Sequence, residues 1–139
     1  MSRSAESKPW SSLIRDDPRW QFDAGTLVHR DAPRQPPPPA GSTEGLKQLV
    51  VRYVYAAQNR SRAVRNAIAE LIDGLAEPQW GLNFGAGSTR FHSRILNLDV
   101  SRGPHSDIVN AGDELPFRDG SLDLVISQEV LEHLEDPVL

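Results

Sequence analysis

Two glycines at the end of a short apolar run are the first residues whose type and spacing could support chemistry. Gly85 and Gly87 follow residues 81–84 and are separated by Ala86. Glycine allows a sharp turn and lets a bound molecule approach the backbone with no Cβ in the way. In open α/β sheets such a turn lies at the carboxyl edge of the first strand, where ligands bind. Two glycines at this spacing are also common in turns that bind no ligand. Neighbouring residues must therefore show whether this turn belongs to a binding site.

Two carboxylates follow the next two apolar runs. Asp99 comes directly after residues 94–98, and Asp113 comes shortly after residues 107–110. A carboxylate at the tip of the second strand can accept hydrogen bonds from both hydroxyls of a ribose. A polar side chain beyond the third strand can reach an adenine edge. Each aspartate also has a simpler interpretation, as a residue that forms a turn or caps a helix.

The elements that would position these residues are short, almost wholly apolar runs separated by loops. Such runs are typical of parallel strands that are covered on both faces. Four of them are predicted as strands: residues 81–84, 94–98, 107–110 and 122–126. A helix is expected at residues 129–134. Only twelve positions separate Gly87 from Asp99, too few for a crossover helix plus a strand, so a loop or a single helical turn is expected between them.

The beginning of the chain has a different composition. Residues 1–43 are poor in apolar side chains and include the proline-rich stretch 34–41. Proline fixes φ and lacks the N–H group, so this stretch favours an extended linker. A disordered tail is therefore predicted for residues 1–43. Three aromatic residues within it either dock on the domain as a flap or have no structural role: Trp10, Trp20 and Phe22.

A helical lead-in is predicted between the tail and the strands, over residues 44–79. Its first helix runs from about residue 43 to about residue 57. The second begins after a cap at Asn59 or Ser61, and Gly74 lies near its end. Both segments place apolar residues at helical spacing along one face. The remaining residues, 80–139, form the predicted α/β domain.

Composition narrows the class of protein. The 139 residues carry a net charge of −4, which argues against nucleic acid as the main partner. There is no cysteine, and the four histidines are scattered, so no metal site is expected. No apolar run reaches the length of a membrane span, and the N-terminus shows no secretory signal. We therefore expect a soluble, cytoplasmic protein.

Two further stretches give the pattern a family resemblance. Residues 115–123 read LPFRDGSLD, and residues 123–133 read DLVISQEVLEH. Together with the glycine turn and the two aspartates, they resemble class I S-adenosylmethionine-dependent methyltransferases of the methyltransferase type 11 kind, over residues 80–139. The resemblance implies a Rossmann-like α/β fold with a mostly parallel, seven-stranded sheet. Since the chain ends shortly after the fourth strand, we expect it to be a fragment, incomplete at the C-terminus.

The resemblance also implies roles for individual residues, with S-adenosylmethionine as the cofactor. The glycine turn would line the methionine and ribose end of the cofactor, Asp99 would hold the ribose, and Asp113 would face the adenine. The full set of implied cofactor-binding residues is Asn83, Gly85, Ala86, Gly87, Asp99, Asp113, Glu114, Leu115, Ser127 and Gln128. No catalytic residue can be assigned from the sequence. The nearest candidates for a general base are Glu129 and His133, and His133 is equally well explained as a residue that packs or caps a helix.

The sequence departs from the family pattern at two positions. Asn83 stands where many relatives have an acid, so any bond to the amino group of the cofactor would lack an ion pair. Thr89 replaces the third glycine of the fuller turn.

Two other functions remain open at this point. One is a nicotinamide-dependent oxidoreductase, although Arg90 occupies a position where the dinucleotide motif needs glycine. The other is a remnant that binds a cofactor or a partner chain without catalysis. The methyl acceptor is unidentified and is expected to be a small molecule, a lipid or a glycan. The sequence leaves the oligomeric state open.

Overall fold

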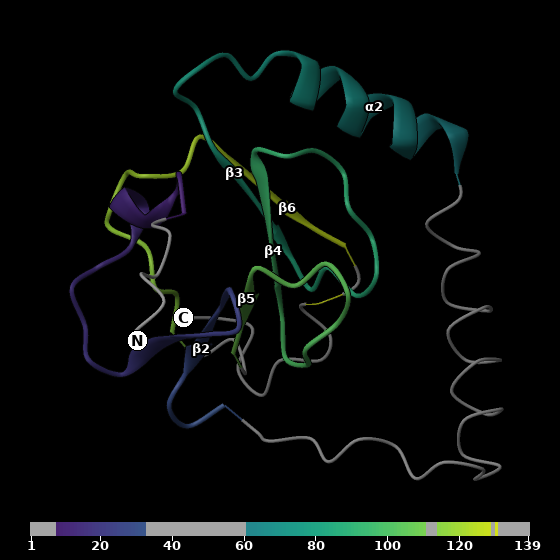
Figure 1. Cartoon of the computed structure of the whole chain (residues 1–139). Coiled ribbons are helices and arrows are strands. Elements are labelled where there is room, and N and C mark those ends of the chain that lie inside the picture. Colours follow the sequence, from purple (N-terminus) through teal and green to yellow (C-terminus); the bar gives the residue numbers. More distant parts are fainter. Residues whose placement is uncertain (1–7, 33–60, 111–113, 129, 131–139) are drawn as a thin grey trace, which may run out of the picture. The chain divides into compact units, whose positions relative to one another are not determined.

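The computed structural model describes residues 8–32, 61–110, 114–128 and 130 (Figure 1). The proline-rich stretch 34–41 and the predicted helix at 43–57 lie outside these residues. So does the predicted helix at 129–134, of which only Val130 is described. The chain divides into two compact units. One consists of residues 1–33 and 77–139, and the other of residues 34–76. Each unit is described by itself.

The first unit contains a six-stranded sheet (Figure 1). Its strand order is β1-β2-β5-β4-β3-β6. Every neighbouring pair is parallel except β1 and β2, which are antiparallel. The strands are β1 (Trp20–Asp23), β2 (Thr26–His29), β3 (Gly81–Phe84), β4 (Ile95–Asp99), β5 (Ile108–Val109) and β6 (Leu124–Ser127).

The four predicted strands are present. The first has the predicted bounds, and the other three differ from the prediction by one or two residues at their ends. In space the first predicted strand lies between the second and the fourth, and the third lies beyond the second. This is the strand order of doubly wound folds, in which ligands bind at the carboxyl ends of the strands. The mostly parallel sheet confirms the Rossmann-like fold class.

The connection from β3 to β4 contains no helix. Residues 85–94 form turns and irregular structure, as the short spacing from Gly87 to Asp99 predicts. A crossover between parallel strands usually carries a helix that covers one face of the sheet. In this protein a loop without a helix connects β3 to β4.

The prediction of a disordered tail is wrong for residues 8–32. This segment forms a short 3₁₀ helix, η1 (Ser11–Leu13), and the β1–β2 hairpin. Strand β2 pairs with β5, where Leu27 lies opposite Ile108. The physical reason is that the edge of β5 offers unpaired backbone groups and an apolar surface, neither of which is visible in the composition of the N-terminal segment itself.

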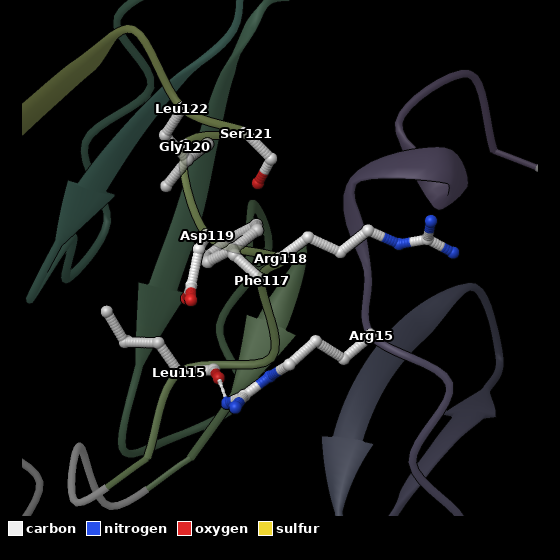
Figure 2. Close-up of a pocket in the computed structure, with 8 residues that line it drawn as sticks. All are labelled: Arg15, Leu115, Phe117, Arg118, Asp119, Gly120, Ser121 and Leu122. Atoms are coloured by element: carbon white, nitrogen blue, oxygen red, sulfur yellow. Dashed lines mark hydrogen bonds between the residues drawn. The ribbon is translucent and has the colours of Figure 1, made fainter.

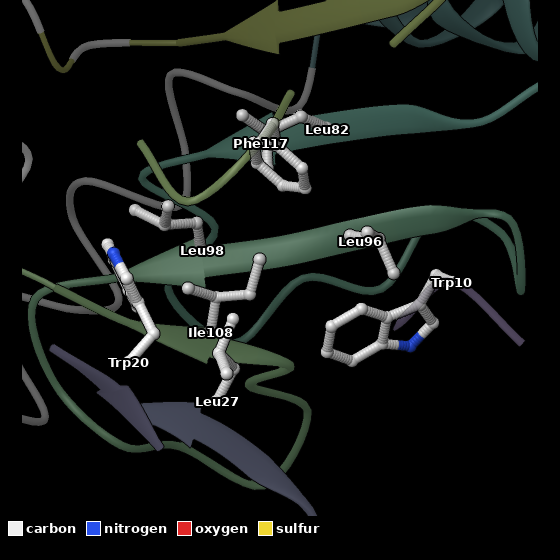
Figure 3. Close-up of a cluster of buried hydrophobic side chains, with 8 residues drawn as sticks. All are labelled: Trp10, Trp20, Leu27, Leu82, Leu96, Leu98, Ile108 and Phe117. Atoms are coloured by element: carbon white, nitrogen blue, oxygen red, sulfur yellow. The ribbon is translucent and has the colours of Figure 1, made fainter. Parts of the chain in front are cut away.

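A cluster of eight buried apolar side chains lies on one face of the sheet, here called the apolar face. Two of the three N-terminal aromatic residues, Trp10 and Trp20, belong to this cluster, so docking on the domain is the correct alternative for them. Phe22 is 47% exposed, and its ring lies tilted against that of Trp10, with 5.6 Å between the ring centroids. The eight buried side chains drawn in Figure 3 form this cluster: Trp10, Trp20, Leu27, Leu82, Leu96, Leu98, Ile108 and Phe117.

The opposite face carries two buried amides and is called the amide face. Asn83 on β3 and Asn97 on β4 lie opposite each other in register, one residue beyond the pair Leu82 and Leu96. Because successive side chains of a strand point to opposite faces, a leucine pair and an asparagine pair share the same two strands.

The second unit contains one described helix, α2 (Arg62–Asp73). Ser61 occupies the N-cap position and Gly74 the C-cap position, which confirms the prediction for this helix. Val64 and Leu71 on its apolar stripe are exposed. Among the described helices, none is long and apolar enough to cross a membrane.

Candidate functional site

The glycine turn begins where β3 ends. Gly85 has φ of 73° and Gly87 has φ of 54°, in the left-handed region that side chains with a Cβ rarely adopt. The turn is fastened to the end of β4, because the backbone N–H groups of Gly85 and Ala86 both donate to the carbonyl of Leu98, at 2.9 and 3.1 Å. The predicted turn is therefore present and lies at the carboxyl edge of the sheet.

The two glycines have different surroundings. A Cβ on Gly85 would collide with the side chain of Val130, so that space is filled by the protein itself. Among the described residues, no atom would lie within 4 Å of a Cβ on Gly87. Both positions favour glycine through their φ, and Val130 further excludes a side chain at Gly85. Close approach of a ligand stays a prediction, for which Gly87 offers the space.

Asp99 lies directly against the turn. Its Oδ2 accepts a hydrogen bond from the backbone N–H of Gly87 at 2.7 Å. Its Oδ1 accepts from the backbone N–H of Ser101 at 3.1 Å and from the Ser101 hydroxyl at 3.3 Å. An ionised carboxylate has about four acceptor positions, and the described donors fill three of them. No donor from the described residues occupies the fourth position, which is on Oδ2.

The amides of Asn83 and Asn97 form a network that the sequence analysis missed. The Asn83 side chain donates to Oδ1 of Asn97 at 3.3 Å and is 4% exposed. The Asn97 side chain donates to the carbonyls of Thr89 and His105, at 2.8 and 3.1 Å. Asn97 thus ties the far end of the glycine turn to the loop before β5. The sequence signal was a polar residue in the middle of an otherwise apolar strand.

An ion pair supports the same region. Arg90 contacts Asp107 through Nη1 and Oδ2, and it also donates to the carbonyl of His105 at 3.3 Å. The same Oδ2 of Asp107 accepts from the backbone N–H of Asn97 at 2.9 Å. Arg90 therefore links the glycine turn to the start of β5, at the position where a dinucleotide motif would place glycine.

The loop after β5 contains the predicted adenine-facing residues. Asp113 lies outside the described residues, as do its neighbours 111 and 112. Asn110, just before them, is buried; its backbone donates to the carbonyl of Asp99 at 3.0 Å, and its side chain donates to the carbonyl of Glu114. Glu114 and Leu115 follow with exposed side chains. The start of this loop is thus joined to the strand end that carries Asp99.

Residues at the end of β6 border the turn from the other side. Ser127 pairs with Phe84, the residue before Gly85, and its side chain is exposed. Gln128 follows and is half-buried. The two candidate bases, Glu129 and His133, lie outside the described residues. The strand ends therefore bring Ser127, Gly85 and Asp99 to one edge of the sheet.

A cavity of about 410 Å³ lies elsewhere, between Arg15 and the loop that leads into β6 (Figure 2). Of the predicted site residues, it includes Leu115. Its lining residues are Arg15, Leu115, Phe117, Arg118, Asp119, Gly120, Ser121 and Leu122. Within the described part of the chain, no group of three or more His, Cys, Asp or Glu side chains could hold a metal ion.

The family comparison covers the region that carries this site. Residues 85–139 match the model of a methyltransferase domain. No curated protein and no solved structure matches the chain significantly. The match begins at the first glycine of the turn and includes Asp99 and residues 115–133, which carry the most specific part of the resemblance. Residues 85–139 therefore resemble a methyltransferase domain, and the mostly parallel sheet is consistent with a class I methyltransferase.

Proposed function

We propose that this protein is an S-adenosylmethionine-dependent methyltransferase whose cofactor binds at the carboxyl edge of the sheet, around the glycine turn and Asp99. One observation carries the proposal. The carboxylate of Asp99 and the N–H of Gly87 are 2.7 Å apart, and no described residue fills the space where a Cβ of Gly87 would lie. This places a carboxylate that can accept from hydroxyl groups next to an uncrowded backbone, within residues that match a methyltransferase domain.

The free acceptor position of Asp99 fits the ribose of the cofactor. Oδ2 can accept from one hydroxyl directly. Oδ1 can accept from the second hydroxyl when the Ser101 hydroxyl, at 3.3 Å, rotates away. The backbone bonds from Gly87 and Ser101 remain, so the carboxylate keeps its orientation while it binds.

The other residues of the proposed site surround this anchor. Gly85, Ala86 and Gly87 would line the methionine end, and Ser127 with Gln128 would border the methyl group. Asp113 would accept from the adenine amino group, with Glu114 and Leu115 beside the ring. Asn83 is 4% exposed and donates to Asn97. A direct hydrogen bond from Asn83 to the cofactor would therefore require it to give up this bond.

The bound cofactor would supply a methyl group on a positively charged sulfur, and the protein would supply position and electrostatics. Asp99 and the turn would hold the nucleoside, while Ser127 and Gln128 would bound the path of the acceptor. Glu129 and His133 are our candidates for taking a proton from an acceptor that must lose one. The acceptor we propose is a small molecule, a lipid or a glycan.

Binding of S-adenosylhomocysteine to the full chain tests the cofactor directly. We expect it to raise the Tm, whereas NAD leaves the Tm unchanged. Asp99→Asn should weaken binding by about 10- to 100-fold in calorimetry, since it replaces a charged acceptor by a neutral one. Asp123→Asn is the matched control, because Asp123 also accepts from a backbone N–H, that of Trp80 at 2.9 Å, at the opposite end of the strands. Equal affinity of both variants, or stabilisation by NAD, would contradict the proposal.

The two glycines provide a second test. Gly87→Ala places a methyl group into open space, so it should weaken S-adenosylhomocysteine binding while the backbone strain costs about 1–2 kcal/mol of stability. Gly85→Ala adds a collision with Val130 and should destabilise the fold more. If Gly87→Ala binds as the wild type does, the cofactor does not lie against this turn.

A further inference from the structure

The segment Leu13–Arg19, here called the N-terminal brace, precedes the family match and lies along residues 114–118. Ile14 and Phe117 form an antiparallel bridge. On either side of the bridge, the N–H of Arg15 donates to the carbonyl of Pro116 at 2.8 Å, and the N–H of Arg118 donates to the carbonyl of Leu13 at 2.9 Å. The brace therefore pairs with the loop as a short strand would.

Side chains extend this pairing toward the proposed adenine end of the site. The guanidinium of Arg15 donates to the carbonyl of Leu115 (Figure 2). In the opposite direction, Arg118 donates through Nε to the carbonyl of Ile14 at 3.0 Å. Arg19 reaches furthest, with Nη1 2.7 Å from Oε2 of Glu114. The brace thus contacts the two residues that we place beside the adenine ring.

Arg19 is held in position by a second carboxylate. Its Nη2 lies 2.6 Å from Oδ2 of Asp17, and its Nε lies 3.1 Å from both Asp17 oxygens. The backbone N–H of Arg19 also donates to Oδ1 of Asp17 at 2.9 Å. These bonds from Arg19 lower the pKa of Asp17 to about 2. The guanidinium plane is therefore oriented before its remaining nitrogen meets Glu114, as suits a planar, forked donor.

We propose that the N-terminal brace positions the adenine side of the cofactor site and that Arg19 is the positioning residue. This inference rests on the proposed function. The brace holds Glu114 through Arg19 and the carbonyl of Leu115 through Arg15. Residues whose positions are set before a ligand binds lose less conformational freedom on binding.

Calorimetry with S-adenosylhomocysteine on the full chain tests the role of Arg19. Arg19→Ala should weaken binding by about two- to fivefold, the range expected for a solvent-exposed ion pair. Arg30→Ala is the matched control: it removes the same charge from the same hairpin, but Arg30 donates to the carbonyl of Pro18, at 3.3 Å, and not to the loop. Equal affinities of Arg19→Ala and Arg30→Ala would overturn the proposal.

A double-mutant cycle separates positioning from general loss of stability. If Arg19 acts through Glu114, Arg19→Ala combined with Glu114→Gln should bind no more weakly than the weaker of the two single variants. Arg19→Lys should recover part of the affinity, because it keeps the charge but not the fork. Additive losses in the cycle would show that Arg19 does not act through Glu114.

Hydrogen exchange distinguishes failure of the brace from failure of the cofactor assignment. Without any ligand, amides of residues 114–118 should exchange faster in Arg19→Ala than in Arg30→Ala. With S-adenosylhomocysteine, amides of residues 13–19 should become more protected in the wild type, because coupling is reciprocal. A wild type that binds no S-adenosylhomocysteine refutes the proposed function. Unchanged exchange at residues 114–118 in Arg19→Ala refutes the brace.

Discussion

On the apolar face of the sheet Leu82 and Leu96 lie opposite each other, and one residue further along the same two strands Asn83 and Asn97 lie opposite each other on the amide face. The leucines join a continuous apolar cluster that includes two N-terminal tryptophans. The asparagines join a network that ends on the carbonyls of the glycine turn and of the loop before β5. Apolar contacts are not directional and stabilise the sheet as a whole, whereas hydrogen bonds have direction and fix particular loops. The leucine pair therefore contributes to the stability of the sheet, whereas the asparagine pair also fixes the loops around the glycine turn.

The largest expected effect is on the apolar face. Leu96 is fully buried, so Leu96→Ala should lower the free energy of unfolding by about 3 kcal/mol, through lost burial and a residual cavity. Urea titration followed by circular dichroism measures this. Leu96→Met, which nearly conserves volume, should cost less than about 1.5 kcal/mol. Equal losses for both variants would mean that packing does not stabilise this face.

On the amide face, Asn97→Leu should cost about 1–3 kcal/mol, because it leaves the carbonyls of Thr89 and His105 without their donor. Unlike Leu96→Ala, it should also increase hydrogen exchange in the glycine turn at urea concentrations where the sheet is intact. Mass spectrometry of peptides that cover residues 85–94 provides the measurement. Uniform loss of protection across the sheet would contradict the division between the faces.

A smaller effect is expected at Arg90. Arg90→Ala removes the ion pair with Asp107, whose side chain is 16% exposed and keeps its bond from the Asn97 backbone. The expected loss of stability is about 1 kcal/mol at low ionic strength, and it should shrink in 1 M NaCl because salt screens partly exposed charges. If the loss of stability is the same at both salt concentrations, Arg90 stabilises the fold by packing of its side chain and not by its charge.

The smallest expected effect is on the stability of the protein at acidic pH. The pKa of Asp17 is lowered from 3.8 to about 2 by the bonds from Arg19. A carboxyl group with a lowered pKa in the folded state contributes stability that is fully present above pH 3.8 and is lost as the pH falls to about 2. Asp17→Asn should therefore flatten the pH dependence of the unfolding free energy between these values. Urea titrations at pH 5 and pH 2.5 compare the variant with the wild type, and parallel curves would show that Asp17 does not contribute.

Prediction succeeded where the structural signal is local. The run Gly81–Phe84 is apolar throughout and is followed by the glycine turn, so both the strand and the turn could be identified from neighbouring residues. The contact between Asp99 and Gly87 also followed, because adjacent parallel strands end at the same edge. The helix Arg62–Asp73 was visible for the same reason, as a stripe of apolar residues at helical spacing.

Prediction failed where the signal lies in a distant part of the chain. The strands Trp20–Asp23 and Thr26–His29 are only four residues long, with two apolar residues each, and they join the sheet through the pairing of β2 with β5, about 80 residues later. The role that we propose for Arg19 depends on its ion pair with Glu114, which forms only in the folded state. Composition averages over neighbours in sequence, so it could not reveal either contact.

The sequence by itself determined the sheet strands of residues 81–127, the glycine turn at their carboxyl edge and the resemblance to a methyltransferase domain. Each of these follows from residues that are close together in the sequence. The tertiary structure alone decided that the N-terminal hairpin extends the sheet, that Asn97 connects two loops and that the cavity near Arg15 lies away from the glycine turn. These features arise from pairing between segments far apart in the chain, and the free energy of such contacts depends on which surfaces folding brings together.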